Sequence, residues 1–181
     1  MQIKLSADQI EAFYHDEFVT SQVQAFTTLV SARGVKSDVV VDVGGGVGHF
    51  ASALSTSGTV GSVRVIDTDP VSVRLCEEKG LYAKQGDALA PPVNGDEDVV
   101  CFNLILHHLV GNSERATLSM QSQALTSWHG KANALFVDEY IYDFAEVAKR
   151  FSDDTGTKEN GGDLGFFERR MMVQEFDETA F

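Results

Sequence analysis

The stretch VVVDVGGGVGHF, residues 39–50, holds one carboxylate, Asp42, followed by four glycines within five positions. An apolar run that leads into glycines is typical of a β-strand entering a ligand-binding loop, because glycine permits positive φ and lets the backbone approach a ligand closely. A pyrophosphate group prefers a loop free of negative charge at a helix N-terminus. Asp42 therefore favours a ligand that carries an ammonium or sulfonium group.

The spacing of the glycines also argues against a dinucleotide. Gly44, Gly46 and Gly48 follow Asp42 in a D-x-G-x-G-x-G arrangement. A dinucleotide-binding loop prefers G-x-G-x-x-G, and its third glycine would fall where this chain has His49 and Phe50. A glycine turn that serves only tight packing of strand against helix remains the alternative interpretation.

Further polar residues follow three later apolar runs. VRVIDTDP places Asp67 at the end of one run, where a carboxylate can accept hydrogen bonds from both hydroxyls of a ribose. KQGDAL places Asp87 after the next, either to contact an adenine amino group or to form an Asx turn after Gly86. DVVCFNLILHHL leaves three more polar side chains near the same edge: Asn103, His107 and His108.

The elements that position these residues follow from the hydrophobic pattern. Short apolar runs predict strands over residues 38–43, 62–67, 81–85, 98–105 and 133–140. Amphipathic stretches predict helices between them, with Asp69 as N-cap and Pro70 as first helical residue of one, and two N-terminal helices, the second ending near Gly34. The alternation predicts an α/β fold with a doubly wound, mostly parallel sheet of about five strands.

Residues 38–140 resemble a class I S-adenosylmethionine-dependent methyltransferase. The resemblance rests on VDVGGGVG, VIDTDP, QGDAL and VCFNLILHHL, which match that family's glycine, strand-two, strand-three and strand-four motifs in order. It implies a Rossmann-like fold in which the three glycines wrap the methionine part of S-adenosylmethionine. Asp67 would bind the ribose, and Asp87 with Ala88 would flank the adenine. Asp42 and Asn103 complete the candidate cofactor-binding residues.

The same resemblance makes residues 1–35 a helical lid, with Phe13, Tyr14 and Phe18 as cover residues; ordinary helix-to-sheet packing explains those aromatic side chains equally well. A sulfonium activates its methyl group, so transfer can rest on alignment alone. An oxygen nucleophile can also need a base, and His107 or His108 is the candidate because imidazole titrates near neutral pH.

Composition narrows the function classes. A chain of 181 residues, 43% hydrophobic, suits one domain with a small appendage. A net charge of −13 without any cluster of Lys and Arg argues against nucleic acid as a partner. We expect no membrane span, since no apolar run of about 18 residues occurs. Cys76 and Cys101 lack CxxC spacing, which indicates a reducing, cytoplasmic compartment and no metal site.

The C-terminal residues 143–181 do not continue the methyltransferase pattern, which would close with a helix and an antiparallel strand pair. FAEVAKRFSDD, GGDLGFF and MVQEFDETAF instead resemble a helix, loop and helix of the parvulin-type peptidyl-prolyl isomerases. That resemblance places Asp154 at an active-site position and Leu164, Met172 and Phe176 in a proline pocket. The family's two histidines are absent, so no isomerase activity is expected from this fragment alone.

We therefore expect a methyltransferase-like domain over residues 1–142, joined to a parvulin-like fragment over 143–181 in a natural or man-made fusion. The leading hypothesis is methyl transfer to a small-molecule acceptor. One alternative is a methyltransferase fold that lost catalysis and serves as a scaffold or binding module; a weaker one is a binder of prolyl peptides. The sequence leaves the acceptor and the oligomeric state open.

Overall fold

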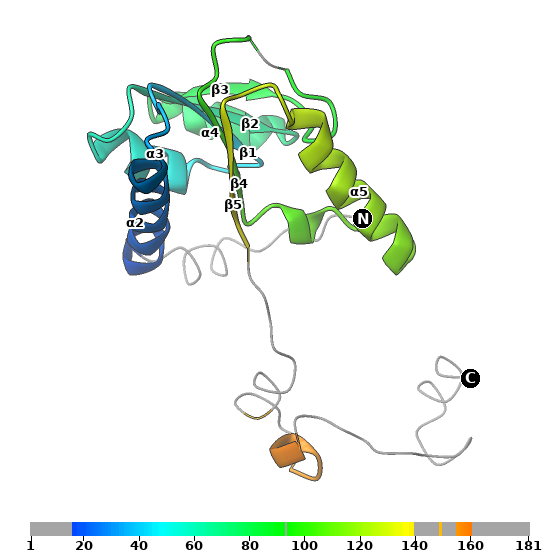
Figure 1. The fold of residues 1–181 in the computed structure, drawn as a ribbon. Coiled ribbons are helices and arrows are strands. Elements are labelled where there is room, and N and C mark those ends of the chain that lie inside the picture. Colours follow the sequence, from blue (N-terminus) through cyan, green and yellow to red (C-terminus); the bar gives the residue numbers. More distant parts are fainter. Residues whose placement is uncertain (1–15, 93, 140–148, 150–154, 161–181) are drawn as a thin grey trace. The chain divides into compact units, whose positions relative to one another are not determined.

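The computed structural model describes residues 16–92, 94–139, 149 and 155–160 (Figure 1). The chain divides into two compact units, Met1–Glu139 and Tyr140–Phe181. The described part of the second unit contains a short 3-10 helix, η2 (Lys158–Asn160), in which the Asn160 N–H donates to the Thr157 carbonyl at 2.9 Å. Six residues singled out from the sequence lie outside the described residues: Phe13, Tyr14, Asp154, Leu164, Met172 and Phe176.

The first unit is built on a five-stranded parallel sheet in the order β3-β2-β1-β4-β5 (Figure 1). The strands are β1 (Val39–Val43), β2 (Ser62–Asp67), β3 (Tyr82–Gln85), β4 (Val99–Asn103) and β5 (Ala134–Asp138). The order reverses between β1 and β4, and in such sheets ligands bind beyond the carboxyl ends of the strands at that reversal. The predicted α/β, Rossmann-like sheet is confirmed.

Four α-helices accompany the sheet in the described residues: α2 (Asp16–Arg33), α3 (His49–Thr56), α4 (Pro70–Glu78) and α5 (Glu114–Trp128). The predicted end of α2 is correct. Gly34 has a φ of 59°, its N–H donates to the Ser31 carbonyl, and the Val35 N–H donates to the Val30 carbonyl. This pair of bonds is the Schellman arrangement, in which a left-handed glycine closes the last turn of a helix.

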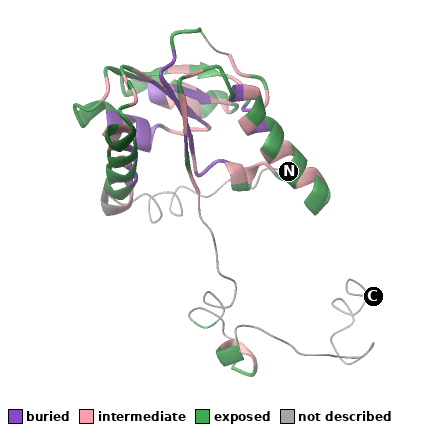
Figure 2. Cartoon of the chain, viewed as in Figure 1, coloured by how far each residue is buried: buried purple, intermediate pink, exposed green. Residues whose placement is uncertain are grey.

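Both faces of the sheet are covered, so four of the five residues in each of the central strands β1 and β4 are buried (Figure 2). Helices α2 and α5 lie on opposite sides of the sheet (Figure 1). On the α2 side, the Phe26 ring packs edge-on against Phe136, with ring centroids 5.3 Å apart. On the α5 side, Trp128 packs edge-on against Phe102 at 6.3 Å. Double coverage explains why β1 reads as a continuous apolar run rather than an alternating one.

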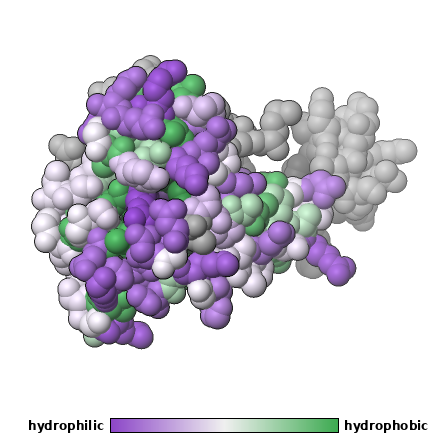
Figure 3. All heavy atoms as spheres, turned by 90° about the horizontal axis from the view of Figure 1, so that it is seen from above, coloured by the Kyte–Doolittle hydropathy of each residue, from purple (hydrophilic) through white to green (hydrophobic). Residues whose placement is uncertain are grey.

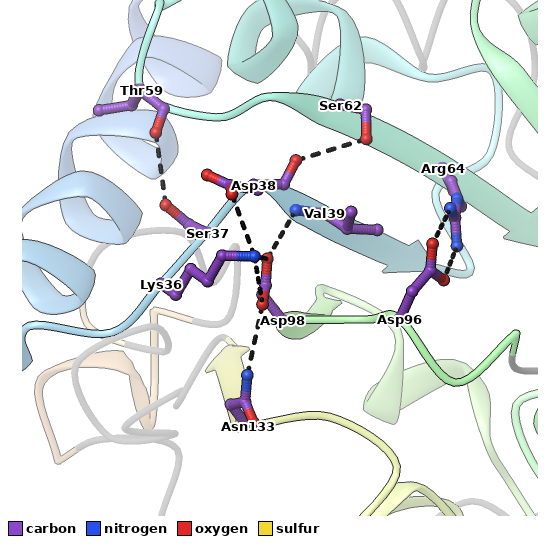
Figure 4. Close-up of polar contacts among 10 residues, drawn as sticks. All are labelled: Lys36, Ser37, Asp38, Val39, Thr59, Ser62, Arg64, Asp96, Asp98 and Asn133. Atoms are coloured by element: carbon purple, nitrogen blue, oxygen red, sulfur yellow. Dashed lines mark hydrogen bonds and ion pairs between the residues drawn. The ribbon is translucent and has the colours of Figure 1, made fainter.

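At the amino-terminal ends of the strands, opposite the carboxyl ends where ligands bind in such sheets, Asp98 joins several elements (Figure 4). Its buried carboxylate accepts hydrogen bonds from the Val39 N–H at 2.9 Å, from Lys36 Nζ at 3.3 Å and from Asn133 Nδ2 at 3.3 Å. Burial alone would raise the pKa of Asp98, but the bonds from Val39 and Lys36 outweigh it and hold the pKa below its usual value. One side chain thus joins β1, the start of β4 and the residue before β5.

We expect Asp98→Asn to lower the free energy of unfolding by about 1–2 kcal/mol, because the amide keeps one acceptor oxygen but loses the charge that its three donors bond. Urea titration of both proteins measures the difference. Asp96→Asn is the matched control, since Asp96 pairs with Arg64 while exposed to solvent (Figure 4) and should change stability much less. Equal effects of the two substitutions would contradict the role given to Asp98.

Figure 3 shows hydrophilic residues over most of one face, with hydrophobic residues scattered among them. Among the residues that the structure describes, no helix is both long enough and apolar enough to cross a membrane.

Candidate active site

A cavity of about 300 Å³ lies at the carboxyl ends of β1, β2 and β4. Eight of the residues predicted from the sequence line it: Asp42, Gly44, Gly46, Asp67, Asp87, Ala88, Asn103 and His108. Gly48 and His107 are not among the lining residues. Side chains that the sequence analysis did not select for the site, including Ser72, Ile105 and Leu109, complete the wall.

The glycines of the loop differ in what surrounds them. Gly44 and Gly48 have φ values of 70° and 79°, and a Cβ there would lie 2.3 Å from Ile105 Cδ1 and 2.6 Å from Leu81 Cδ1, respectively. Both positions therefore favour glycine, because a side chain would be strained at this φ and crowded by its neighbours. At Gly48, which does not line the cavity, this agrees with the alternative interpretation that the glycine serves tight packing of strand against helix. Gly46, with a φ of 54°, has no atom within 4 Å of such a Cβ, so it borders open space.

Asp67 holds the loop to the end of β2. Its Oδ2 accepts a hydrogen bond from the Gly46 N–H at 2.9 Å, and its Oδ1 accepts one from the Asp69 N–H at 2.8 Å. Asp69 and Pro70 begin α4 as predicted, but the Asp69 carboxylate accepts from Ser72 Oγ at 3.0 Å instead of capping a backbone N–H. Asp67 is thus positioned by two backbone donors, and its remaining lone pairs can accept hydroxyl groups.

Asp42 is an ionisable group that no donor of the described residues hydrogen-bonds. It is 0% exposed, and neither carboxylate oxygen has a hydrogen-bond partner among the described residues. Burial, followed by the negative charge of Asp67, raises the pKa of Asp42 to about 7. A Cβ on Gly45 would lie 2.4 Å from Oδ2 of Asp42, so the loop passes directly over this carboxyl group. A buried acceptor of this kind at a cavity wall suits a cationic ligand group.

Asp87 and Ala88 follow β3 at another wall of the cavity. Asp87 Oδ1 accepts the Leu89 N–H at 2.8 Å, which is the Asx turn considered from the sequence. The exposed carboxylate still lines the cavity, so the contact with adenine stays a prediction. The Ala88 carbonyl accepts from Trp128 Nε1 at 2.7 Å, which ties this wall to the core beneath α5.

The chain turns sharply after β4. Leu104 has a φ of 55°, the only positive value for a non-glycine residue in the described ranges, and its N–H donates to the Asp138 carbonyl at 2.8 Å. The strand therefore ends at Asn103, and its predicted extension to residue 105 was wrong. Such strained backbone persists where the surrounding structure enforces it, often at functional sites. Residues Leu106–His108 then form a 3-10 helix, η1.

The turn gives the two adjacent histidine side chains different surroundings. His108 lines the cavity, and partial burial, followed by the neighbouring His107, lowers the pKa of its imidazole. His107 instead places Nδ1 2.7 Å from Oε1 of Glu139, and its ring centroid is 4.1 Å from that of His108. Of the two base candidates, His108 is the one that a ligand in the cavity can reach.

Helix α2 reaches the same edge through Gln22. Its buried side-chain amide donates to Asn103 Oδ1 at 2.9 Å and to Asp138 Oδ2 at 3.4 Å. The sequence analysis selected neither Gln22 nor the Asp138 and Glu139 pair. The predicted strand over 133–140 carried a usable signal, because acidic residues that end a parallel strand lie at the same edge as the glycine loop.

Comparisons with known proteins agree with this geometry. Residues 41–127 match a family model described as a methyltransferase domain. The sugar N-methyltransferase KedS8 of a Streptoalloteichus species superimposes with a TM-score of 0.62 at 13% identity, covering 78% of this chain and 56% of that one. The first unit has a class I methyltransferase fold.

Two further solved structures are similar to about the same extent. DesVI of Streptomyces venezuelae has a TM-score of 0.61 at 14% identity, covering 78% of this chain and 60% of that one. CalS10 of Micromonospora echinaspora, an amino pentose methyltransferase solved with S-adenosylmethionine bound, has a TM-score of 0.57 at 17% identity, covering 79% and 61%. At these identities the likeness shows the fold, and the chain spans little more than half the length of these neighbours.

The C-terminal part of the chain matches a different family. Residues 113–181 match a model described as a PPIC-type PPIase domain, which confirms the parvulin-like resemblance and overlaps the methyltransferase match along α5. The foldase protein PrsA of Oceanobacillus iheyensis is 59% identical over 39 residues, which are 22% of this chain and 13% of that protein. PrsA of Caldanaerobacter subterraneus is 62% identical over 39 residues, again 13% of its length.

Proposed function

We propose that this protein is an S-adenosylmethionine-dependent methyltransferase acting on a small-molecule acceptor. The observation that carries the proposal is the buried Asp42 carboxyl group, which lines the cavity beneath the glycine loop without a hydrogen-bond donor among the described residues. The aminium group of a methionine moiety in the cavity would supply the opposite charge across the loop that covers Asp42.

The charges of the whole cavity support a cationic ligand. Four carboxylates line it, from Asp42, Asp67, Asp69 and Asp87, and no Lys or Arg of the described residues does. The volume of about 300 Å³ lies at the lower end of ordinary small-molecule sites. We assign the loop from Gly44 to Gly46 to the methionine part, Asp67 to the ribose and Asp87 with Ala88 to the adenine.

When bound, S-adenosylmethionine supplies a methyl group attached to a positively charged sulfur; after transfer, that sulfur is part of a neutral thioether. The protein orients the acceptor, excludes water and, for an acceptor that must lose a proton, receives that proton at His108. His108 suits the task because its lowered pKa keeps the imidazole neutral near pH 7. Methyl transfer by alignment alone needs no base and remains the alternative for His107 and His108.

Calorimetric titration with S-adenosylhomocysteine tests cofactor binding directly. We expect saturable micromolar binding, and absence of binding at millimolar ligand would refute the proposal. Amino sugars are the first acceptors to test, because the names of two structural neighbours specify a sugar N-methyltransferase and an amino pentose methyltransferase. Binding of S-adenosylhomocysteine without methyl transfer to any acceptor would instead favour the alternative of a methyltransferase fold that serves as a scaffold or binding module.

Cofactor affinity should depend on pH through Asp42. The ionised carboxylate attracts an aminium group and the protonated one does not, so affinity is highest above the pKa of about 7 and falls below it. We expect S-adenosylhomocysteine to bind about tenfold more weakly at about pH 6 than at about pH 8. Asp42→Asn should abolish this dependence; constant affinity of the native protein over that range would contradict the assignment.

A further inference from the structure

The η1 turn that presents His108 to the cavity is held on two sides. From α5, the Gln121 side chain donates Nε2–H to the Leu106 carbonyl at 2.9 Å. From the end of β5, Glu139 accepts the His107 backbone N–H with Oε2 at 3.3 Å and contacts His107 Nδ1 with Oε1 at 2.7 Å. Both oxygens of Glu139 therefore engage one residue, His107, through its backbone and its ring.

The contact from Glu139 decides which ring nitrogen of His107 carries a proton. An ionised carboxylate can only accept hydrogen bonds, so a hydrogen bond between it and Nδ1 needs a proton on Nδ1. In a neutral imidazole this leaves Nε2 as the acceptor, and the bond also fixes the plane of the ring. The two imidazole centroids lie 4.1 Å apart with their planes tilted by 41°, so the His107 ring forms a fixed wall beside His108.

We propose that Glu139 is a positioning residue, which orients His107 and through it holds His108 at the cavity. This inference rests on the proposed function and gives the two histidines different roles. His108 contacts the methyl acceptor, and His107, held by Glu139, keeps His108 in position. For an acceptor that must lose a proton, His108 would receive it while the acceptor's nucleophilic atom gains the methyl group; the bond from sulfur to that methyl group would break and leave a neutral thioether.

The surroundings of His108 match this division. Among the described residues, the charged and titratable groups that act on the pKa of His108 are His107 on the same turn, Glu139 after β5 and Asp67 at the end of β2. His107 opposes protonation of His108, whereas Glu139 and Asp67 favour it. Glu139 contacts the ring of His107 and does not occupy the cavity. It can therefore influence the position of the His108 ring through His107 and leave space for the methyl acceptor.

Nitrogen NMR of the full chain with isotopically labelled histidine tests the proposal. The native protein should show His107 protonated on Nδ1. Glu139→Gln, which keeps an acceptor oxygen, should preserve that signal, and Glu139→Ala should lose it. Gln121→Ala is the matched control, because it loosens the same turn from α5 and leaves the pair of His107 and Glu139 intact.

The second measurement is the change in the His108 ring signals when S-adenosylhomocysteine is added. We expect this change in the native protein, in Glu139→Gln and in Gln121→Ala, and its loss in Glu139→Ala. A native His107 protonated on Nε2, or equal effects of Glu139→Ala and Gln121→Ala, would overturn the proposal. If calorimetry shows no binding of S-adenosylhomocysteine, the proposed function fails, while the protonation of His107 still decides the role of Glu139.

Discussion

Replacing Trp128 with alanine is expected to lower the free energy of unfolding by about 3–5 kcal/mol, which is the usual cost of removing a fully buried large aromatic side chain. Trp128 is 0% exposed, packs edge-on against Phe102 and donates its indole N–H to the Ala88 carbonyl. The substitution therefore leaves a cavity beneath α5 and removes the donor of a buried carbonyl, two costs that add.

The measurement is urea unfolding followed by far-ultraviolet circular dichroism, since Trp128 is the only tryptophan and its removal abolishes the tryptophan fluorescence. Leu118→Ala is the matched control on the same helix, because Leu118 is 59% exposed and should change stability by no more than about 0.5 kcal/mol. Trp128→Phe should fall between the two, as it keeps a ring and loses the hydrogen bond. Similar results for Trp128→Ala and Leu118→Ala would show that α5 does not depend on this anchor.

Asp67→Ala should weaken the binding of S-adenosylhomocysteine by about 30- to 150-fold, equivalent to about 2–3 kcal/mol. The substitution removes the proposed ribose acceptor. It also removes the acceptor that holds the Gly46 and Asp69 N–H groups, so the glycine loop loses its tie to the end of β2. Calorimetry at fixed pH gives the dissociation constants of both proteins.

Two variants separate the ligand contact from other effects. Asp38→Ala removes an equal charge at the start of β1, where Asp38 pairs with Lys36 at the opposite edge of the sheet, and should leave affinity unchanged. Asp67→Asn keeps an oxygen acceptor for one loop N–H and should lose less affinity than alanine. Unchanged binding by Asp67→Ala would remove Asp67 from the cofactor site and leave it a loop-holding role.

Much of the fold could be predicted from the sequence because each strand and helix carries its own signal. The apolar runs locate all five strands, and Gly34 marks the end of α2. The end of β4 could not be predicted. LILHHL continues an apolar pattern, whereas the turn at Leu104 depends on a backbone bond to Asp138, far along the chain.

The same distinction between local and distant contacts applies to the site. The glycine motif and the predicted strand ends indicated that Asp42, Asp67 and His108 lie at the same edge of the sheet, and in the structure all three line one cavity. The sequence could not tell His107 from His108, since adjacent residues differ only in what they face. Gln22 was missed because its partners, Asn103 and Asp138, lie on other elements and no motif links them.

Asp138 and Glu139 also set a limit on how this protein can be dissected or rebuilt. They are the last two residues of the first unit, and they hold Gln22 and His107, respectively. A shortened chain that stops before Asp138 retains every residue lining the cavity, yet it loses the contact of Asp138 with Gln22 in α2 and both contacts of Glu139 with the histidine turn. Any transplant of this module into another protein should therefore keep Glu139 and place the splice after it.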